Sequence, residues 1–120
     1  MIAAEIAGWV KAFALTASIE VPIAAWLFAR AEPSVRRRLG VAFLANLVSH
    51  PVVWFVLPRI FVSYPRMVVT AESWAVASEA IFYALVFPNA GPSRAFGVSA
   101  LANGASLGVG LLLRALTGWV

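Results

Sequence analysis

Four apolar stretches, each close to the length that crosses a lipid bilayer, make up most of this chain. They cover residues 12–29, 40–58, 70–87 and 95–113. An α-helix rises about 1.5 Å per residue, so about 20 residues span the roughly 30 Å of hydrocarbon. The connecting segments are short and marked by Pro, Gly and Arg, as turns are. We therefore predict an all-α membrane protein, a four-helix bundle of transmembrane helices that forms a single integral membrane domain over residues 1–120.

The composition and charge agree with a bilayer rather than with water or nucleic acid. Of the 120 residues, 62% are hydrophobic and only 12% are charged, whereas about a quarter of the residues in a soluble domain are charged. The net charge of +4 would suggest nucleic-acid binding in a soluble protein. Here the basic residues gather at the predicted helix ends, where they contact lipid headgroups. We expect the lipid bilayer as a partner and no nucleic acid.

The two halves of the chain carry the same pattern. Residues 40–49 read GVAFLANLVS and residues 97–106 read GVSALANGAS, with six of ten positions identical. This self-similarity predicts a tandem duplication of a two-helix hairpin, with repeat 1 at about 12–58 and repeat 2 at about 70–113. Two helices per copy give both copies the same orientation. Parallel repeats are thus expected, related by a pseudo-twofold axis along the membrane normal.

The repeated polar residues fall inside the apolar stretches. Glu20 and Glu79 each precede a Pro-Ser pair by thirteen residues, and Asn46 and Asn103 occupy the same place in the two LANxxS segments. These four residues, which we call the Glu/Asn layer, are expected near the bilayer centre. A charged side chain there costs about 2.5–3.5 kcal/mol on insertion scales and needs a partner. An amide would join helices at lower cost, so we interpret the glutamates as functional.

Other polar side chains share these helix faces. His50 follows Asn46 by one helical turn, and Tyr83 follows Glu79 in the same way. Asn and Ser in membrane helices more often join helices than bind ligands, so a structural role is favoured for them. His50 has no counterpart in the second repeat, where Leu107 stands. The candidate substrate- or ion-binding residues are Glu20, Asn46, Ser49, His50, Glu79, Tyr83, Asn103 and Ser106.

Two prolines inside the predicted helices add backbone acceptors. Pro22 and Pro51 each lack an N–H and so free the carbonyl four residues earlier, at Ser18 and Leu47. Free carbonyl oxygens beside a carboxylate suit a cation.

Three classes of function fit this pattern. The favoured one is a small transporter or channel that binds a proton, a cation or a small cationic substrate at the Glu/Asn layer. The second is an intramembrane metal-binding protein or enzyme with Glu20, His50 and Glu79 as candidate metal ligands. The chain has no His-Glu-x-x-His signature, and we rate an enzyme lower. The third is an accessory or structural subunit whose polar layer specifies assembly. No catalytic residue and no cofactor is assigned.

The loop at 30–39 sets the expected orientation. It holds the densest basic cluster in the chain, Arg30, Arg36, Arg37 and Arg38. The positive-inside rule places such a loop in the cytoplasm, with both termini outside. We expect an integral cell membrane protein of the bacterial inner-membrane type.

Two segments admit alternative interpretations. Residues 1–31 are expected to remain in the mature chain rather than to act as a cleaved signal peptide, because they lack a basic leader and carry Glu5 and Glu20. Gly104 and Gly108 form a GxxxG step, which permits close helix approach. We favour packing inside the bundle for this step over a homo-oligomer interface.

Overall fold

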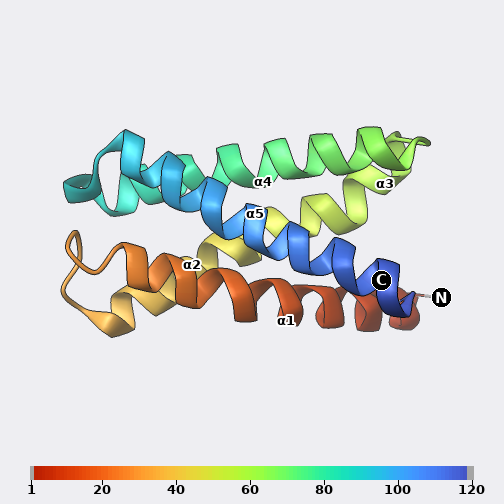
Figure 1. Cartoon of the computed structure of the whole chain (residues 1–120), viewed down its shortest axis with the longest axis horizontal. Coiled ribbons are helices and arrows are strands. Elements are labelled where there is room, and N and C mark those ends of the chain that lie inside the picture. Colours follow the sequence, from red (N-terminus) through yellow and green to blue (C-terminus); the bar gives the residue numbers. More distant parts are fainter. Residues whose placement is uncertain (1, 119–120) are drawn as a thin grey trace.

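The computed structural model describes residues 2–118 as an all-α chain of four helical rods (Figure 1). One end of the molecule carries the two loops that follow α1 and α4, and the other end carries both termini and α3. We call these the loop end and the terminal end. The elements are α1 (Ile2–Leu27), α2 (Val35–Pro51), the π-helical turn η1 (Val52–Val56), α3 (Leu57–Ile60), α4 (Tyr64–Val86), the short η2 (Pro88–Ala90) and α5 (Pro92–Thr117).

Three of the rods are long and apolar enough to cross a membrane. They are α1, the continuous rod Val35–Ile60 that joins α2, η1 and α3, and α5, each of 26 residues. The prediction of helices long and apolar enough to cross a membrane is confirmed for these three. α4 has 23 residues but does not belong to this group. It carries the charged residues Arg66, Glu72 and Glu79.

Proline shapes two of the rods in different ways. Pro22 lies inside α1, which continues without interruption to Leu27. Pro51 ends α2, and the wider π-helical turn η1 follows it. Near this point the indole Nε1 of Trp74 donates a hydrogen bond to the Ser49 carbonyl at 3.1 Å. A side chain from α4 therefore binds the backbone of α2 just before this irregularity.

Arginines at the loop end bind the C-terminal carbonyls of neighbouring helices. Arg37, at the start of α2, donates to the Val86 carbonyl of α4 at 3.1 Å. Arg94, at the start of α5, donates to the Leu27 carbonyl of α1 at 3.0 Å. The last carbonyls of a helix have no partner inside it and carry partial negative charge, so a guanidinium is well suited to them. These bonds tie the two hairpins together across the loop end.

The tightest packing also lies at the loop end. Phe28, Tyr83 and Phe87 are each at most 1% exposed and pack against small residues such as Ala42 and Ala95. Small residues let helix backbones approach closely. The apolar core thus fills the bundle between the Glu/Asn layer and the two loops.

The outer surface presents large apolar residues, as a lipid-facing surface does. Trp26 and Leu85, for example, are 75% and 76% exposed. The GxxxG step shares this exposure, because a Cβ added at Gly104 or Gly108 would meet nothing within 4 Å. The expectation that this step packs inside the bundle was wrong. α5 turns its Ser99 and Asn103 inward, which leaves the glycine face outside.

Candidate intramembrane site

A cavity of about 580 Å³ opens between the rods and reaches the buried glutamates. Its outer rim includes Pro58, Tyr64 and Arg114, which are exposed near the terminal end. Its inner part is lined by Glu20 and Glu79, only 1% and 2% exposed. Toward the loop end, the aromatic core closes the bundle beyond these acids.

Glu79, on α4, is held by two hydrogen bonds from other helices. Ser49 Oγ of α2 donates to its Oε2 at 2.7 Å. Asn103 Nδ2 of α5 donates to its Oε1 at 3.3 Å. Both donors were predicted from the sequence as site residues, and the fold brings them to one carboxyl group. Each oxygen of Glu79 thus has a partner.

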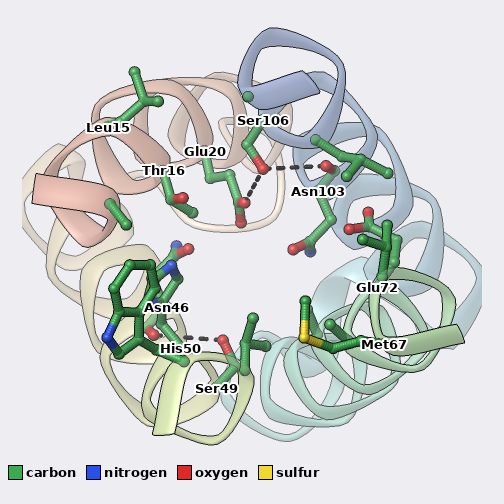
Figure 2. Close-up of a pocket in the computed structure, with 18 of the residues that line it drawn as sticks. Leu15, Thr16, Glu20, Asn46, Ser49, His50, Met67, Glu72, Asn103 and Ser106 are labelled. Atoms are coloured by element: carbon green, nitrogen blue, oxygen red, sulfur yellow. Dashed lines mark hydrogen bonds between the residues drawn. The ribbon is translucent and has the colours of Figure 1, made fainter. Parts of the chain in front are cut away.

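Glu20, on α1, is only half satisfied. Ser106 Oγ of α5 donates to its Oε2, and Figure 2 shows the two side chains facing each other. Its Oε1 is buried and has no hydrogen-bond partner among the described residues. The Glu79 carboxyl lies within hydrogen-bonding reach of Glu20. An ionised carboxylate only accepts hydrogen bonds, so two ionised carboxylates cannot bond to each other. In that state the buried Oε1 of Glu20 has no donor.

The two asparagines of the Glu/Asn layer bond back to their own helices. Asn46 Nδ2 donates to the Ala42 carbonyl at 2.9 Å, and Asn103 Nδ2 donates to the Ser99 carbonyl at 2.9 Å. Asn46 Oδ1 is buried without a partner in the described part of the chain. It lines the cavity together with Asn103. The layer therefore offers at least two buried oxygen acceptors that no donor occupies.

His50 and Tyr83 occupy different surroundings. His50 lines the cavity and packs edge-on against Phe13, with ring centroids 5.6 Å apart. Tyr83 is fully buried against Phe28 and is not one of the cavity-lining residues. The fold thus brings seven of the eight candidate residues to the cavity wall and leaves Tyr83 in the aromatic core behind it.

The cavity also contains residues that the sequence analysis did not select. Glu72 of α4 and Thr16 of α1 line its wall, as Figure 2 shows. Glu72 precedes Glu79 by seven residues, which places both on one face of a helix. This seven-residue spacing could have identified Glu72 as a site residue from the sequence alone.

The acidic residues do not form a metal-binding cluster. In the segment 2–118, no three His, Cys, Asp or Glu side chains are grouped closely enough to hold a metal ion. The proposed ligands Glu20, His50 and Glu79 all line the cavity without forming such a group. The arrangement is that of a carboxyl pair with hydroxyl and amide donors.

Comparison of the chain with protein-family models, with curated proteins and with solved structures gives no match.

Proposed function

We propose that this protein is a small membrane transporter or channel that binds a proton or a cation at the Glu/Asn layer. The observation that carries this proposal is the buried, unpartnered Oε1 of Glu20 beside the Glu79 carboxyl, at the inner end of a cavity. A proton held between the carboxyl groups, or a cation bound there, supplies the missing partner. A carboxyl in hydrocarbon is by default a functional residue.

The proposal includes a tandem duplication, supported by reciprocal contacts. Each residue of the rod Val35–Ile60 corresponds to the residue of α5 that is 57 positions later in the chain. Each residue of α4 corresponds in the same way to the residue of α1 that is 59 positions earlier. Under this rule Ser49 donating to Glu79 is the counterpart of Ser106 donating to Glu20. The arginine bonds at the loop end pair in the same way, and so do the asparagine bonds within each helix.

These pairs are what parallel repeats about a pseudo-twofold axis along the membrane normal would produce. We take repeat 1 as about 12–58 and repeat 2 as about 70–113, with α4 as the fourth transmembrane helix. The proposed orientation puts residues 30–39 in the cytoplasm of a bacterial inner membrane and the mouth of the cavity outside. Each hairpin then supplies one glutamate and one serine to a shared site.

Ion flux into proteoliposomes tests the proposal. Protein is reconstituted with a dye inside that reports the ion under test, a pH-sensitive dye for H⁺ and a Na⁺- or K⁺-sensitive dye for those ions, and a gradient of each ion is imposed in turn. Glu20→Gln and Glu79→Gln keep the side-chain size and a hydrogen-bonding group, and both are expected to reduce flux to the rate of protein-free liposomes. Glu32→Gln is the control, because Glu32 pairs with Arg37 in a loop away from the cavity. Wild-type flux in both site variants would overturn the proposal.

The two other functions have less support. A metal enzyme needs a ligand group that the described residues do not supply. An accessory subunit predicts acids enclosed in a dry bundle, whereas a cavity of about 580 Å³ reaches both glutamates. Transport or conduction requires both buried acids that bind an ion and a cavity through which the ion reaches them.

A further inference from the structure

The cavity is larger than a bare ion requires. Its volume of about 580 Å³ compares with about 30 Å³ for one water molecule in the liquid. It falls within the range of about 300–1,000 Å³ that is typical of small-molecule sites. Such sites combine apolar walls with a few placed polar groups. The apolar part of this wall includes Leu15, Val53, Trp54, Met67, Val68 and Leu111.

The charged groups of the cavity divide by depth. At the rim, the Arg114 guanidinium lies over the Tyr64 ring at 3.9 Å, and Glu5 pairs with Arg59 at 2.8 Å. Further in, the ionisable residues are Glu20, Glu72, Glu79 and His50. Among the described residues that line the cavity, the cationic one, Arg114, is therefore at its mouth, while the interior carries three carboxyl groups.

Glu72 is the least satisfied of the three acids. It is half-buried on the cavity wall, and within residues 2–118 no hydrogen bond or ion pair reaches its carboxyl. The other two acids of the cavity, Glu79 and Glu20, interact with it electrostatically. The unpartnered oxygens of Glu20 and Asn46 belong to residues that are each 1% exposed and that line the same cavity deeper in the bundle. Side-chain oxygens without a hydrogen-bond donor are thus present from the cavity wall at Glu72 to the inner end of the cavity.

We infer that this cavity binds an organic ammonium ion with an apolar body, and that Glu72 forms an outer anionic contact on the way to Glu20 and Glu79. The inference rests on the proposed function and names its substrate class. The positive head satisfies acceptors that have no donor. The apolar body occupies the wall, where the Trp54 ring adds a surface that attracts cations. An inorganic cation would leave that wall without a partner.

Three probes of related shape separate charge from apolar contact. Benzyltrimethylammonium has both features, tetramethylammonium has the charge without the body, and benzylsulfonate has the body with the opposite charge. Binding to the purified full chain in nanodiscs is measured by calorimetry. We expect benzyltrimethylammonium to bind about tenfold or more tightly than tetramethylammonium. No heat of binding is expected for benzylsulfonate.

Two variants test where the ligand lies. Glu72→Gln removes the outer charge and is expected to weaken benzyltrimethylammonium binding about tenfold. Ala71→Phe fills the neighbouring wall and should weaken benzyltrimethylammonium more than tetramethylammonium. Trp54→Leu, which adds no bulk, gives the same comparison if Ala71→Phe fails to fold. Glu32→Gln again serves as the control and should bind like the wild type.

The inference is overturned if benzyltrimethylammonium binds no better than tetramethylammonium, if benzylsulfonate binds equally well, or if Glu72→Gln has wild-type affinity. The flux assay keeps this failure distinct from failure of the proposed function. Glutamate-dependent flux of H⁺, Na⁺ or K⁺ with no organic-cation binding leaves a transporter or channel for small ions. Loss of both results removes both proposals.

Discussion

The rings of Phe28 and Phe87 pack with their centroids 4.9 Å apart at the loop end of the bundle. Each phenylalanine follows a buried glutamate by eight residues and lies just past the C-terminal end of the helix that carries it. The pair, with Tyr83 beside it, separates the Glu20–Glu79 site from the loops. The site in this conformation is therefore closed toward the loop end.

Removing either ring should open this barrier. Phe28→Ala and Phe87→Ala are each expected to destabilise the protein by about 3 kcal/mol, because buried aromatic residues leave cavities. Ion leak in proteoliposomes should rise in the same variants. Phe96→Ala is the matched control, since Phe96 is 58% exposed on the outer surface. Equal stability and leak in all three variants would contradict a role for the pair as a barrier.

The two serine–glutamate bonds should be equivalent in energy. Ser49→Ala and Ser106→Ala each remove one donor to a buried carboxyl. Interhelical bonds of this kind contribute about 0.6–1.7 kcal/mol, and we expect the two losses to agree within a few tenths of a kcal/mol. Unfolding in mixed micelles measures them. Ser73→Ala should be neutral, because Ser73 is exposed and bonds to its own helix. A large loss at one serine alone would argue against paired repeats.

The arginine bonds at the loop end should stabilise the contact between the hairpins. Arg37→Gln and Arg94→Gln are each expected to lower the free energy of unfolding by about 1 kcal/mol, because a helix carbonyl loses a charged donor. Arg36→Gln is a suitable control on the same helical turn, since the Arg36 side chain makes no hydrogen bond or ion pair with another described residue. Thermal unfolding of the three variants in detergent provides the measurement. Identical midpoints would show that these contacts contribute nothing.

The proposed orientation can be tested by labelling single introduced cysteines, because the chain contains no cysteine of its own. Ala29 and Val62 are exposed in loops at opposite ends of the bundle. In intact cells, a membrane-impermeant maleimide should label Val62→Cys and should reach Ala29→Cys only after permeabilisation. The reverse pattern would invert the topology without affecting the site.

Because Gly104 and Gly108 of α5 face outward, larger side chains should be tolerated there within a single copy of the protein. Gly104→Leu and Gly108→Leu should leave the monomer folded, because the added side chains meet open space. If two copies associate through this face, crosslinking in membranes should fall several-fold in both variants. Gly8→Leu is the contrasting substitution, since a Cβ there comes within 3.1 Å of the Trp54 ring. Unchanged crosslinking would exclude this face as the contact between copies.

The apolar stretches were sufficient to predict helices, because a chain in hydrocarbon must satisfy its backbone hydrogen bonds internally. The prediction of a buried site at Glu20 and Glu79 also came from the sequence, through the cost of placing a carboxyl among apolar residues. Both glutamates are buried as expected. The repeat boundaries and the orientation stay predictions.

Tertiary structure decided which partners those residues have. Ser49 meets Glu79 across thirty positions and Ser106 meets Glu20 across eighty-six, contacts that no local spacing specifies. The rotation of each helix about its axis, set by packing, turned Tyr83 into the aromatic core, Gly104 to the outside and Glu72 into the cavity. Hydropathy along the chain measures how apolar a segment is, and only packing determines which neighbour each face meets.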